Sequence, residues 1–245
     1  MHLSPAPRRA LAVLTLLSAA PLAAQQAHAS SESLYYGVEW RFVRAGDVQA
    51  NWNAGHALDL KLRTVGLVAT LFKVEDSYRS TYDPGFCATS ISLDLHEGRR
   101  NRDVKAAFDR AAGRSTFIEK DLNTGATTLS KEMEVPSCVH DVAGGLRKLR
   151  QLRPEPGTVT ELPLSDGKKV VMARIEAQQR ETVRTPLGQY SAIRYEAFLF
   201  NGVFYGRKGR LFVWISDDDK RLPVQIRIQL PFYVGTITLQ LEKAQ

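Results

Sequence analysis

Hydrophobic and polar residues alternate most regularly near the C-terminus, between residues 209 and 241. Two runs there, residues 224–230 and 237–241, carry an apolar side chain at every second position, and turn residues bound each run. Alternation with a period of two is typical of antiparallel strands that bury one face and expose the other to solvent. We therefore expect this part of the chain to form hairpins in a curved sheet with one buried face.

The same alternation recurs along the rest of the chain. Residues 34–44 and 48–52 predict a first hairpin, residues 58–62 predict a third strand, and more alternating runs follow between turns such as the Asp-Pro-Gly motif at residues 83–85. The apolar run at residues 66–72 has no period and is compatible with helical turns or a buried strand. About a dozen strands with one clear helix predict a mainly β fold. The expected architecture is a curved antiparallel sheet or an incomplete β-barrel, with one or two short helices.

One segment, residues 138–152, predicts a helix. Apolar residues recur there at spacings of three and four, and basic residues follow at the C-terminal end, where they complement the helix dipole. Ser137 is the expected N-cap, and Asp141 lies in the first turn. Gly144 and Gly145 each lower the helix propensity by about 1 kcal/mol. We therefore expect a short helix that is held by packing or that lets a neighbouring element approach closely.

The N-terminus has the pattern of a signal peptide. Two arginines precede an apolar segment at residues 10–20, and a small-residue motif predicts removal of residues 1–29; a cut after Ala24 is the alternative. We expect the remaining chain, residues 30–245, to be a single β-rich domain that is periplasmic or secreted. The break at residues 154–157, which contains proline and glycine, is interpreted as a loop within that domain.

The charge of the chain is mildly positive. It has 33 basic and 26 acidic residues, a formal charge of +7, and loss of residues 1–29 removes two arginines and lowers the charge to +5. The densest basic runs, residues 99–102 and 147–153, are interpreted as solvated surface or, alternatively, as contacts for an anionic partner such as lipid headgroups. A nucleic-acid partner is not expected for an exported protein.

Cys87 and Cys138 are the two cysteines of the chain. In an exported protein an even number of cysteines is consistent with one disulfide, which here would close a loop of about 50 residues and restrict the unfolded chain. Two free, buried cysteines are the alternative.

The sequence contains none of the common catalytic motifs. It has no glycine-rich phosphate loop, no nucleophile elbow, no paired-histidine zinc motif and no Cys-x-x-Cys. His56, His96 and His140 are far apart in sequence. Cys138 lies near His140 in the sequence, as a cysteine nucleophile and its base would. A position at the start of a helix and a disulfide bond explain the presence of Cys138 better than a nucleophilic role does. The acidic run at residues 217–219 is interpreted as a solvated turn rather than a calcium site. We therefore expect no enzymatic activity, no cofactor and no metal.

Aromatic residues are in excess near the last hairpin. The candidate ligand-binding residues are Trp40, Phe198, Phe200, Phe204 and Trp214. They either fill the core or line a pocket for an apolar ligand, because small-molecule sites are concave and rich in aromatic residues. A sheet curved around one short helix is a shape that can leave such a pocket.

Three segments, residues 181–190, 214–218 and 221–224, resemble an uncharacterised family of exported bacterial cell-envelope proteins with a domain of unknown function. The resemblance covers nearly all of the chain after residue 29 and implies one domain. The tryptophan before an acidic turn and the Leu-Pro after it are also distantly similar to the open barrels that carry lipoproteins across the periplasm. That similarity implies an incomplete antiparallel barrel, closed by a helix around an apolar interior. The family has no established catalytic residues that could be assigned to positions of this sequence.

These features lead to two hypotheses. The first is a non-enzymatic periplasmic binding protein that holds a lipid, another apolar ligand or the acyl chain of a lipoprotein in its concave sheet. The alternative is a cell-envelope scaffold or adaptor that binds protein or polysaccharide through a strand edge or the basic helix end. Peripheral contact with the membrane or with envelope proteins is a further class of interaction. An open cavity would favour the first hypothesis, and a filled core would favour the second.

Overall fold

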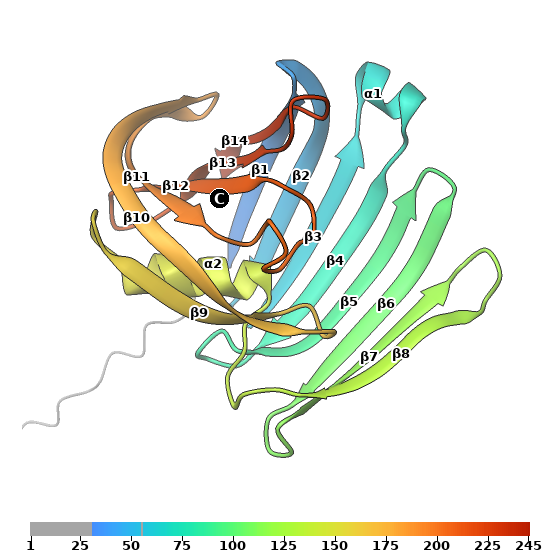
Figure 1. The fold of residues 1–245 in the computed structure, drawn as a ribbon. Helices are drawn as coiled ribbons and strands as arrows, with labels where there is room; N and C mark the ends of the chain where they lie inside the picture. Colours follow the sequence, from blue (N-terminus) through green and yellow to red (C-terminus); the bar gives the residue numbers. More distant parts are fainter. Residues whose placement is uncertain (1–30, 55) are drawn as a thin grey trace, which may run out of the picture.

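A computed structural model describes residues 31–54 and 56–245 of the chain. The predicted signal peptide, residues 1–29, lies outside the described residues. Within them the chain forms fourteen strands and two helices, and all fourteen strands belong to one antiparallel sheet (Figure 1). The sheet curls into an incomplete barrel, which confirms the predicted fold class.

Two helices interrupt the series of strands along the described chain. The elements are β1 (Glu32–Trp40), β2 (Val43–Asn53), β3 (Ala57–Thr64), α1 (Gly66–Leu71), β4 (Glu75–Tyr82), β5 (Ala88–Glu97), β6 (Arg100–Asp109), β7 (Arg114–Asp121), β8 (Thr127–Glu134), α2 (Val142–Leu152), β9 (Val159–Ser165), β10 (Val170–Thr185), β11 (Gly188–Ala197), β12 (Arg210–Ser216), β13 (Pro223–Gln229) and β14 (Thr236–Ala244).

The two ends of the described chain meet in the middle of the sheet. Strand β1 pairs with β14, for example at Tyr36 and Leu241, and from this pair two meanders run outward, β2 to β8 on one side and β13 to β9 on the other. The edges are therefore β8 and β9, which follow each other in the chain. The segment that joins them contains α2, so this helix lies where the sheet does not close (Figure 1).

The backbone just before α2 bridges the gap between the two halves of the sheet. The carbonyl of Val139 accepts a hydrogen bond from the N–H of Ala88 in β5, at 2.8 Å. The next residue, His140, pairs with β9: its N–H donates to the carbonyl of Pro163, and its carbonyl accepts from the N–H of Ser165. This short extended segment therefore links β5 to the edge strand β9.

The turn between β9 and β10 reaches across the same gap and packs on β6 and β7. Gly167 in this turn has a φ of +87°, and a Cβ there would lie 2.5 Å from the Cβ of Ala106 and 3.0 Å from the ring of Phe117. The ammonium group of Lys131 also donates to the carbonyl of Lys168, at 2.6 Å. A glycine is required at position 167 because both the backbone conformation and the close approach exclude a side chain.

Helix α2 begins later than the sequence predicts. Its N-cap is Asp141, whose carboxylate accepts a hydrogen bond from the N–H of Gly144 at 2.5 Å, and not Ser137. The cause is tertiary. Because Cys138 is held in a disulfide and His140 pairs with β9, the backbone before Asp141 has an extended conformation and cannot be part of the helix.

The two glycines of α2 allow the close approach that we expected. A Cβ at Gly144 would lie 2.7 Å from the ring of Tyr82 and 2.9 Å from the carbonyl oxygen of Phe86, and a Cβ at Gly145 would lie 2.7 Å from Leu164. The helix is therefore wedged between the β4–β5 turn and β9. The packing that this permits offsets the low helix propensity of glycine.

The ambiguous apolar run at residues 66–72 forms α1 rather than a buried strand, and none of the residues in this helix is buried. In the part of the chain that the structure describes, neither helix has the length and apolar character needed to cross a membrane.

The core lies inside the curl of the sheet, in three groups of buried side chains. The first group is centred on β1, β2 and β3, the second joins strands β9 to β12 with Leu149 of α2, and the third is centred on β5, β6 and β7. The third group faces the gap in the sheet, and this position matters for the candidate site.

The C-terminal half of α2 is anchored by a largely buried ion pair. Arg150 donates two hydrogen bonds to the carboxylate of Glu32 in β1, both at 2.7 Å, and Arg147 donates a third at 2.9 Å. The Nε of Arg150 also donates to the carbonyl of Arg221, at 2.6 Å. These bonds fasten α2 to the first residue of β1 and to the β12–β13 turn, so the helix closes one end of the barrel.

This ion pair predicts how stability depends on pH. Burial alone would raise the pKa of Glu32, but the hydrogen bond and charge of Arg150 and the charge of Arg147 together hold the pKa below its usual value of 4.5. A carboxylate with a lowered pKa contributes stability that is complete above its unfolded-state pKa and is lost as the pH falls through the folded-state pKa. We expect the free-energy difference between wild type and Glu32→Gln to shrink as the pH falls below 4.5. Urea unfolding between about pH 7 and about pH 3 measures this difference. A difference that stays constant over this range would contradict the prediction.

Candidate functional site

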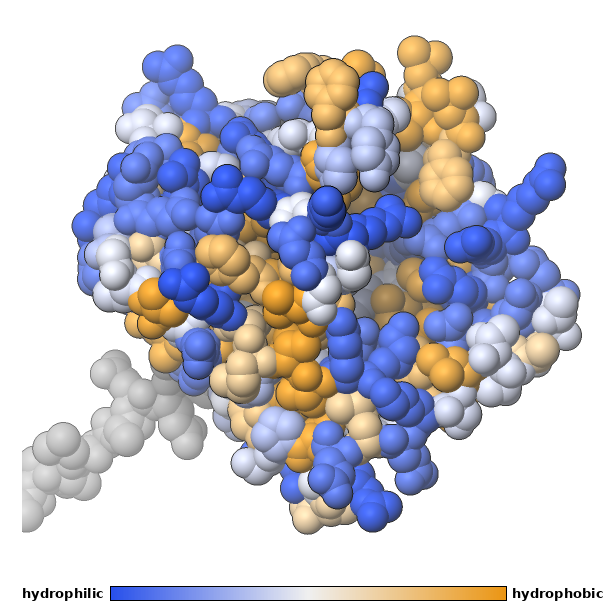
Figure 2. Space-filling view, in the orientation of Figure 1, coloured by the Kyte–Doolittle hydropathy of each residue, from blue (hydrophilic) through white to orange (hydrophobic). Residues whose placement is uncertain are grey.

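A cavity lies on the concave face of β4 to β7, beside the gap in the sheet. It has a volume of about 350 Å³ and is covered by the start of α2, the β9–β10 turn and the loop between β11 and β12. Figure 2 shows the hollow between the two halves of the molecule, with hydrophobic side chains in its depth. The apolar side chains that line it include Ile91, Leu93, Leu95, Val104, Phe117 and Phe204.

The strand register explains why these apolar side chains share one face. Leu93 pairs with Tyr78 on one side and with Val104 on the other, and Ala106 pairs with Phe117. Residues paired across antiparallel strands point to the same face of the sheet. Because β8 and β9 do not pair, this part of the face is covered by loops instead of a second sheet, and a cavity remains.

Two basic side chains, Arg102 and Lys168, are among the residues that line the cavity. Arg102 donates to Glu97 at 2.6 Å, and its Nη1 lies 3.9 Å from Glu119. The Nε of Arg102 is buried and makes no hydrogen bond to any described residue. The ammonium group of Lys168 lies 5.0 Å from the ring centroid of Phe117. Arg102 and Lys168 can therefore each donate hydrogen bonds to a polar or anionic group of a ligand whose apolar part fills the rest of the cavity.

The part of the cover that α2 provides is built around the N-cap of this helix. Asp141 accepts hydrogen bonds from the hydroxyl groups of Tyr78 and Tyr82, and it lies at the edge of the lining. Burial, and then the charge of Asp141, raises the pKa of both tyrosines far above its usual value. Both hydroxyl groups therefore stay protonated as donors, and they hold α2 in place.

A second, smaller chamber lies deeper, between α2 and the first three strands. Its volume is about 90 Å³, and its lining is almost entirely apolar, with Leu34, Leu58 and Leu146 among its walls. The guanidinium of Arg147 closes it against Trp52, 4.8 Å from the ring centroid.

Of the five aromatic residues that the sequence suggested as ligand-binding, the structure places Phe204 in the cavity wall. Its ring packs edge-on against that of Tyr205, with centroids 5.0 Å apart, and Tyr205 in turn contacts Phe200 at 5.2 Å. Phe200 therefore supports the wall from behind without lining it.

The other three aromatic candidates lie away from the cavity. Trp214 is itself buried, but it projects from the face of β12 opposite to Val213 and Ile215, where its ring stacks with Arg227 at 5.0 Å and its N–H donates to Glu181. The two remaining side chains are held at strand ends. Trp40 donates to the carbonyl of Val234 at 2.7 Å, and Phe198 lies 5.2 Å from the guanidinium of Arg174.

Sequence reasoning did not single out the side chains of β5 to β7 that line the cavity. Their alternation was visible, as at Ile91, Leu93 and Leu95, but it predicts a buried face in the same way for every strand. Which buried face lacks a covering layer depends on the order of the strands, so the sequence carried no local signal for this cavity.

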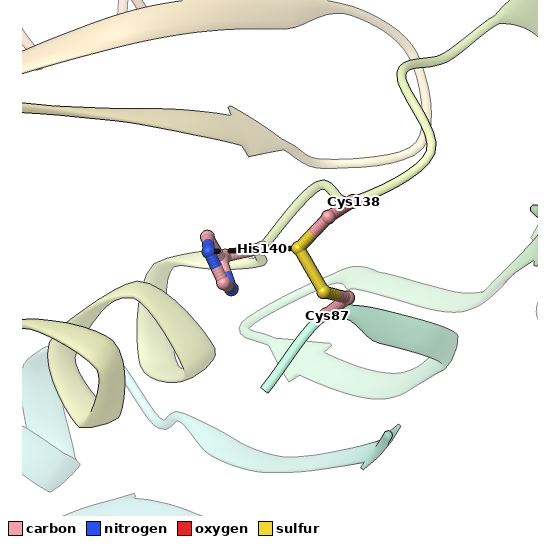
Figure 3. Close-up of side chains that lie close together, drawn as sticks. All are labelled: Cys87, Cys138 and His140. Carbon is pink, nitrogen blue, oxygen red and sulfur yellow. Dashed lines mark hydrogen bonds between the residues drawn. A yellow bond between two sulfur atoms is a disulfide. The ribbon is translucent and has the colours of Figure 1, made fainter. Parts of the chain in front are cut away.

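The structure contains the expected disulfide between Cys87 and Cys138 (Figure 3). His140 lies beside it, with Nε2 at 3.9 Å from the sulfur of Cys138. The Nδ1 of His140 donates to the carbonyl of Phe86 at 2.7 Å, and burial lowers the pKa of the imidazole, which keeps it neutral. These three side chains place their ligand atoms within 4.8 Å of one another. Neither sulfur is a thiolate in the disulfide, however, and the thiolate is the form required of a nucleophile or metal ligand.

The acidic run at residues 217–219 is largely partnered by its own surroundings. Asp217 pairs with Arg180 at 2.7 Å, and Asp218 accepts hydrogen bonds from the hydroxyl of Ser216 and the N–H of Arg221. These contacts are those of a β-turn that is fastened to its neighbours.

Comparisons with known proteins give a family and a fold. A family model described as "Protein of unknown function (DUF3108)" matches residues 34–242. A beta-barrel-like protein of the domain of unknown function DUF1849 from Brucella abortus has a similar crystal structure, with a TM-score of 0.55, 9% sequence identity, and coverage of 89% of this chain and 98% of that one. A DUF1089 family protein from Pseudomonas aeruginosa is more remote, with a TM-score of 0.41, 12% identity, and coverage of 76% and 90%. The search of curated proteins gives no match. At these identities the structural likeness concerns the fold alone.

Proposed function

The chain belongs to the DUF3108 family of proteins of unknown function, and on the geometry of its cavity we propose that it is a non-enzymatic binding protein of the bacterial cell envelope. Its ligand is a lipid or another molecule with a long apolar part, such as the acyl chain of a lipoprotein. After removal of the signal peptide the protein acts in the periplasm.

The cavity on β4 to β7 is the observation that carries this proposal. Its volume of about 350 Å³ is at the lower end of the range for small-molecule sites, which is about 300–1,000 Å³. Its walls are mostly apolar, and Arg102 and Lys168 offer hydrogen-bond donors among the polar residues of the lining. This combination suits an amphipathic ligand that buries its chain and leaves its polar group near one of the two basic side chains.

Mass spectrometry of bound lipid tests the proposal directly. The chain from Ser30 onward contains every described strand and helix, and it can be purified from a bacterial envelope under native conditions and extracted. A stoichiometric lipid is the expected result. A protein that is empty after purification, and that stays empty after incubation with membrane vesicles, would contradict the proposal.

A cavity-filling substitution provides the matching binding experiment. Leu93→Trp places a large ring in the cavity, and we expect it to weaken binding of a fluorescent long-chain fatty acid by at least about tenfold, or about 1.4 kcal/mol. Ile118→Trp is the control, because Ile118 lies on the outer face of β7 and is exposed. A fluorescence titration compares the two variants with wild type. Equal affinities for all three proteins would place the ligand elsewhere.

An adaptor function is the second candidate, and one observation favours it. Strand β8 is an edge of the sheet, and seven of its eight residues are exposed. An extended peptide could add to such an edge through backbone hydrogen bonds. Hydrogen exchange of β8, measured with and without an extended envelope-protein peptide, tests this candidate, since strand addition would protect the outward N–H groups.

A further inference from the structure

The end of the barrel opposite α2 carries large apolar side chains that no other part of the described chain covers. Phe42 in the β1–β2 turn is 99% exposed and Phe232 in the β13–β14 turn is 98% exposed. Leu71 of α1 is 81% exposed, and Leu67 and Tyr233 are also well exposed. Figure 2 shows hydrophobic side chains projecting at the end of the molecule that carries α1 (Figure 1).

The turns that carry these exposed side chains lie in one continuous row. Arg41 Nη2 donates to the carbonyl of Tyr233 at 2.6 Å, so the β1–β2 turn is fastened to the β13–β14 turn. On the other side, the N–H of Val65 at the start of α1 donates to the carbonyl of Ala45 in β2, at 2.9 Å. The ring of Phe72, which follows α1, packs beside Gly98 in the β5–β6 turn. We call this row, residues 41–43, 66–73, 98–100 and 230–235, the rim.

The charge of the rim has one sign. Its four segments contain Arg41, Lys73, Arg99 and Arg100 and no aspartate or glutamate. Lys73 pairs with Glu75, just outside the rim, at 3.0 Å. Arg41, Arg99 and Arg100 form no ion pair within residues 31–54 and 56–245. Positive charge beside exposed apolar side chains complements a surface that is anionic outside and apolar beneath.

A groove behind the two phenylalanine tips adds to this complementarity. It has a volume of about 930 Å³ and runs along the outer face of β13 and β14, with Phe42 and Phe232 among its lining residues. Arg41 and Arg227 line it, and Glu39 is the acidic residue of its wall. Its size and its two guanidinium groups suit a phosphate headgroup.

We propose that the rim docks the protein on a phospholipid bilayer that contains anionic lipids. Phe42, Phe232 and the apolar side chains of α1 enter the interfacial layer, and the arginines bind lipid phosphates. Apolar side chains that project separately into solvent can each insert into a fluid bilayer, whereas a protein partner would need a matching pocket for each of them. Because α2 closes the other end of the barrel, docking leaves the end that carries α2 exposed to water.

The docked orientation also places the cavity next to the membrane. Leu95 and Arg102 line the cavity and pair with each other just before the β5–β6 turn, which is part of the rim. A lipid chain would therefore have a short path between bilayer and cavity. The docking itself does not depend on the cavity being occupied, so the proposal goes beyond the binding function and can fail separately from it.

Vesicle flotation tests the rim. The protein used is the chain from Ser30 onward, because the apolar segment at residues 10–20 would bind membranes by itself. We expect it to float with vesicles that contain phosphatidylglycerol and to float much less with vesicles of phosphatidylcholine alone. Phe42→Ser combined with Phe232→Ser should weaken binding at least about tenfold, and Arg99→Gln combined with Arg100→Gln should weaken binding to the anionic vesicles alone.

Two matched controls separate rim effects from general ones. Ile118→Ser removes an exposed apolar side chain from the outer face of β7, and Lys105→Gln removes an exposed charge from β6, so neither should change flotation. Binding that is absent in wild type, or that survives loss of both phenylalanines, would overturn the proposal. A concentration-dependent dimer that the double phenylalanine variant abolishes, without vesicle binding by wild type, would assign the rim to self-association instead.

A site-specific fluorophore reports insertion directly. The sequence has two cysteines and both are in the disulfide, so Phe42→Cys introduces a single reactive thiol. An environment-sensitive dye at this position should shift to shorter wavelength on addition of anionic vesicles, and the same dye at Ile118→Cys should not. A dye at Phe42→Cys that stays in water while the protein floats would also overturn the proposed orientation.

Discussion

Removal of the disulfide by Cys87→Ser combined with Cys138→Ser is expected to lower the free energy of unfolding by about 4 kcal/mol. The two cysteines are 51 positions apart, and opening a loop of this length restores conformational entropy to the unfolded chain. The structure adds a local reason. The disulfide anchors the segment before α2, whose backbone bridges β5 and β9 across the gap in the sheet.

Urea unfolding of the double variant beside wild type measures this loss. Wild type treated with reductant serves as the control and should match the variant, because both lack the same crosslink. A loss below about 1 kcal/mol would show that the gap is held by the backbone bonds of Val139 and His140 without the crosslink.

Replacing Arg150 with methionine is expected to destabilise the fold by about 3–5 kcal/mol. The side chain of Arg150 is 8% exposed and that of Glu32 is 16% exposed. The substitution removes two of the three hydrogen bonds to a largely buried carboxylate. It also leaves the carbonyl groups of Arg221 and Lys220 without the donors that now satisfy them. Removal of one partner from a buried pair is costly because the remaining charge keeps its desolvation penalty.

Arg153→Met is the matched control for this substitution. Arg153 is the C-cap of the same helix, its side chain is 53% exposed, and its ion pair with Asp219 spans 3.6 Å at the surface. An exposed pair of this kind contributes little to stability. Chemical unfolding of the two variants compares the effects, and equal losses would mean that the Glu32 pair does not hold α2.

The same helix connects stability with the proposed function. The N-terminal end of α2 contributes Asp141 to the cavity, while its C-terminal half is fastened to Glu32. Substitutions that loosen α2 should therefore affect ligand binding as well as unfolding. Rim variants should leave both properties unchanged, because the substituted rim side chains do not line the cavity.

Much of the secondary structure was predictable from local patterns. Alternation identified the strands and the mainly β class, spacings of three and four identified α2, and the even cysteine count indicated the disulfide. The close approach at Gly144 and Gly145 also followed from the sequence, because two glycines in one short helix require a packing reason. Apart from the disulfide, each of these inferences depends on neighbours within a few residues, where backbone geometry determines which side chains share a face.

The tertiary structure alone decided where the sheet stays open and what that opening exposes. Local capping rules predicted that Ser137 begins α2, but pairing of His140 with β9 keeps the preceding backbone extended, and Asp141 caps the helix instead. Alternation placed Leu93 and Leu241 on buried faces in the same way, yet Leu93 borders a cavity and Leu241 is fully packed. The difference arises because β1 pairs with β14 and leaves β8 and β9 as edges. Such pairing joins residues some two hundred positions apart, and a period-two pattern contains no information about which distant strand becomes the neighbour.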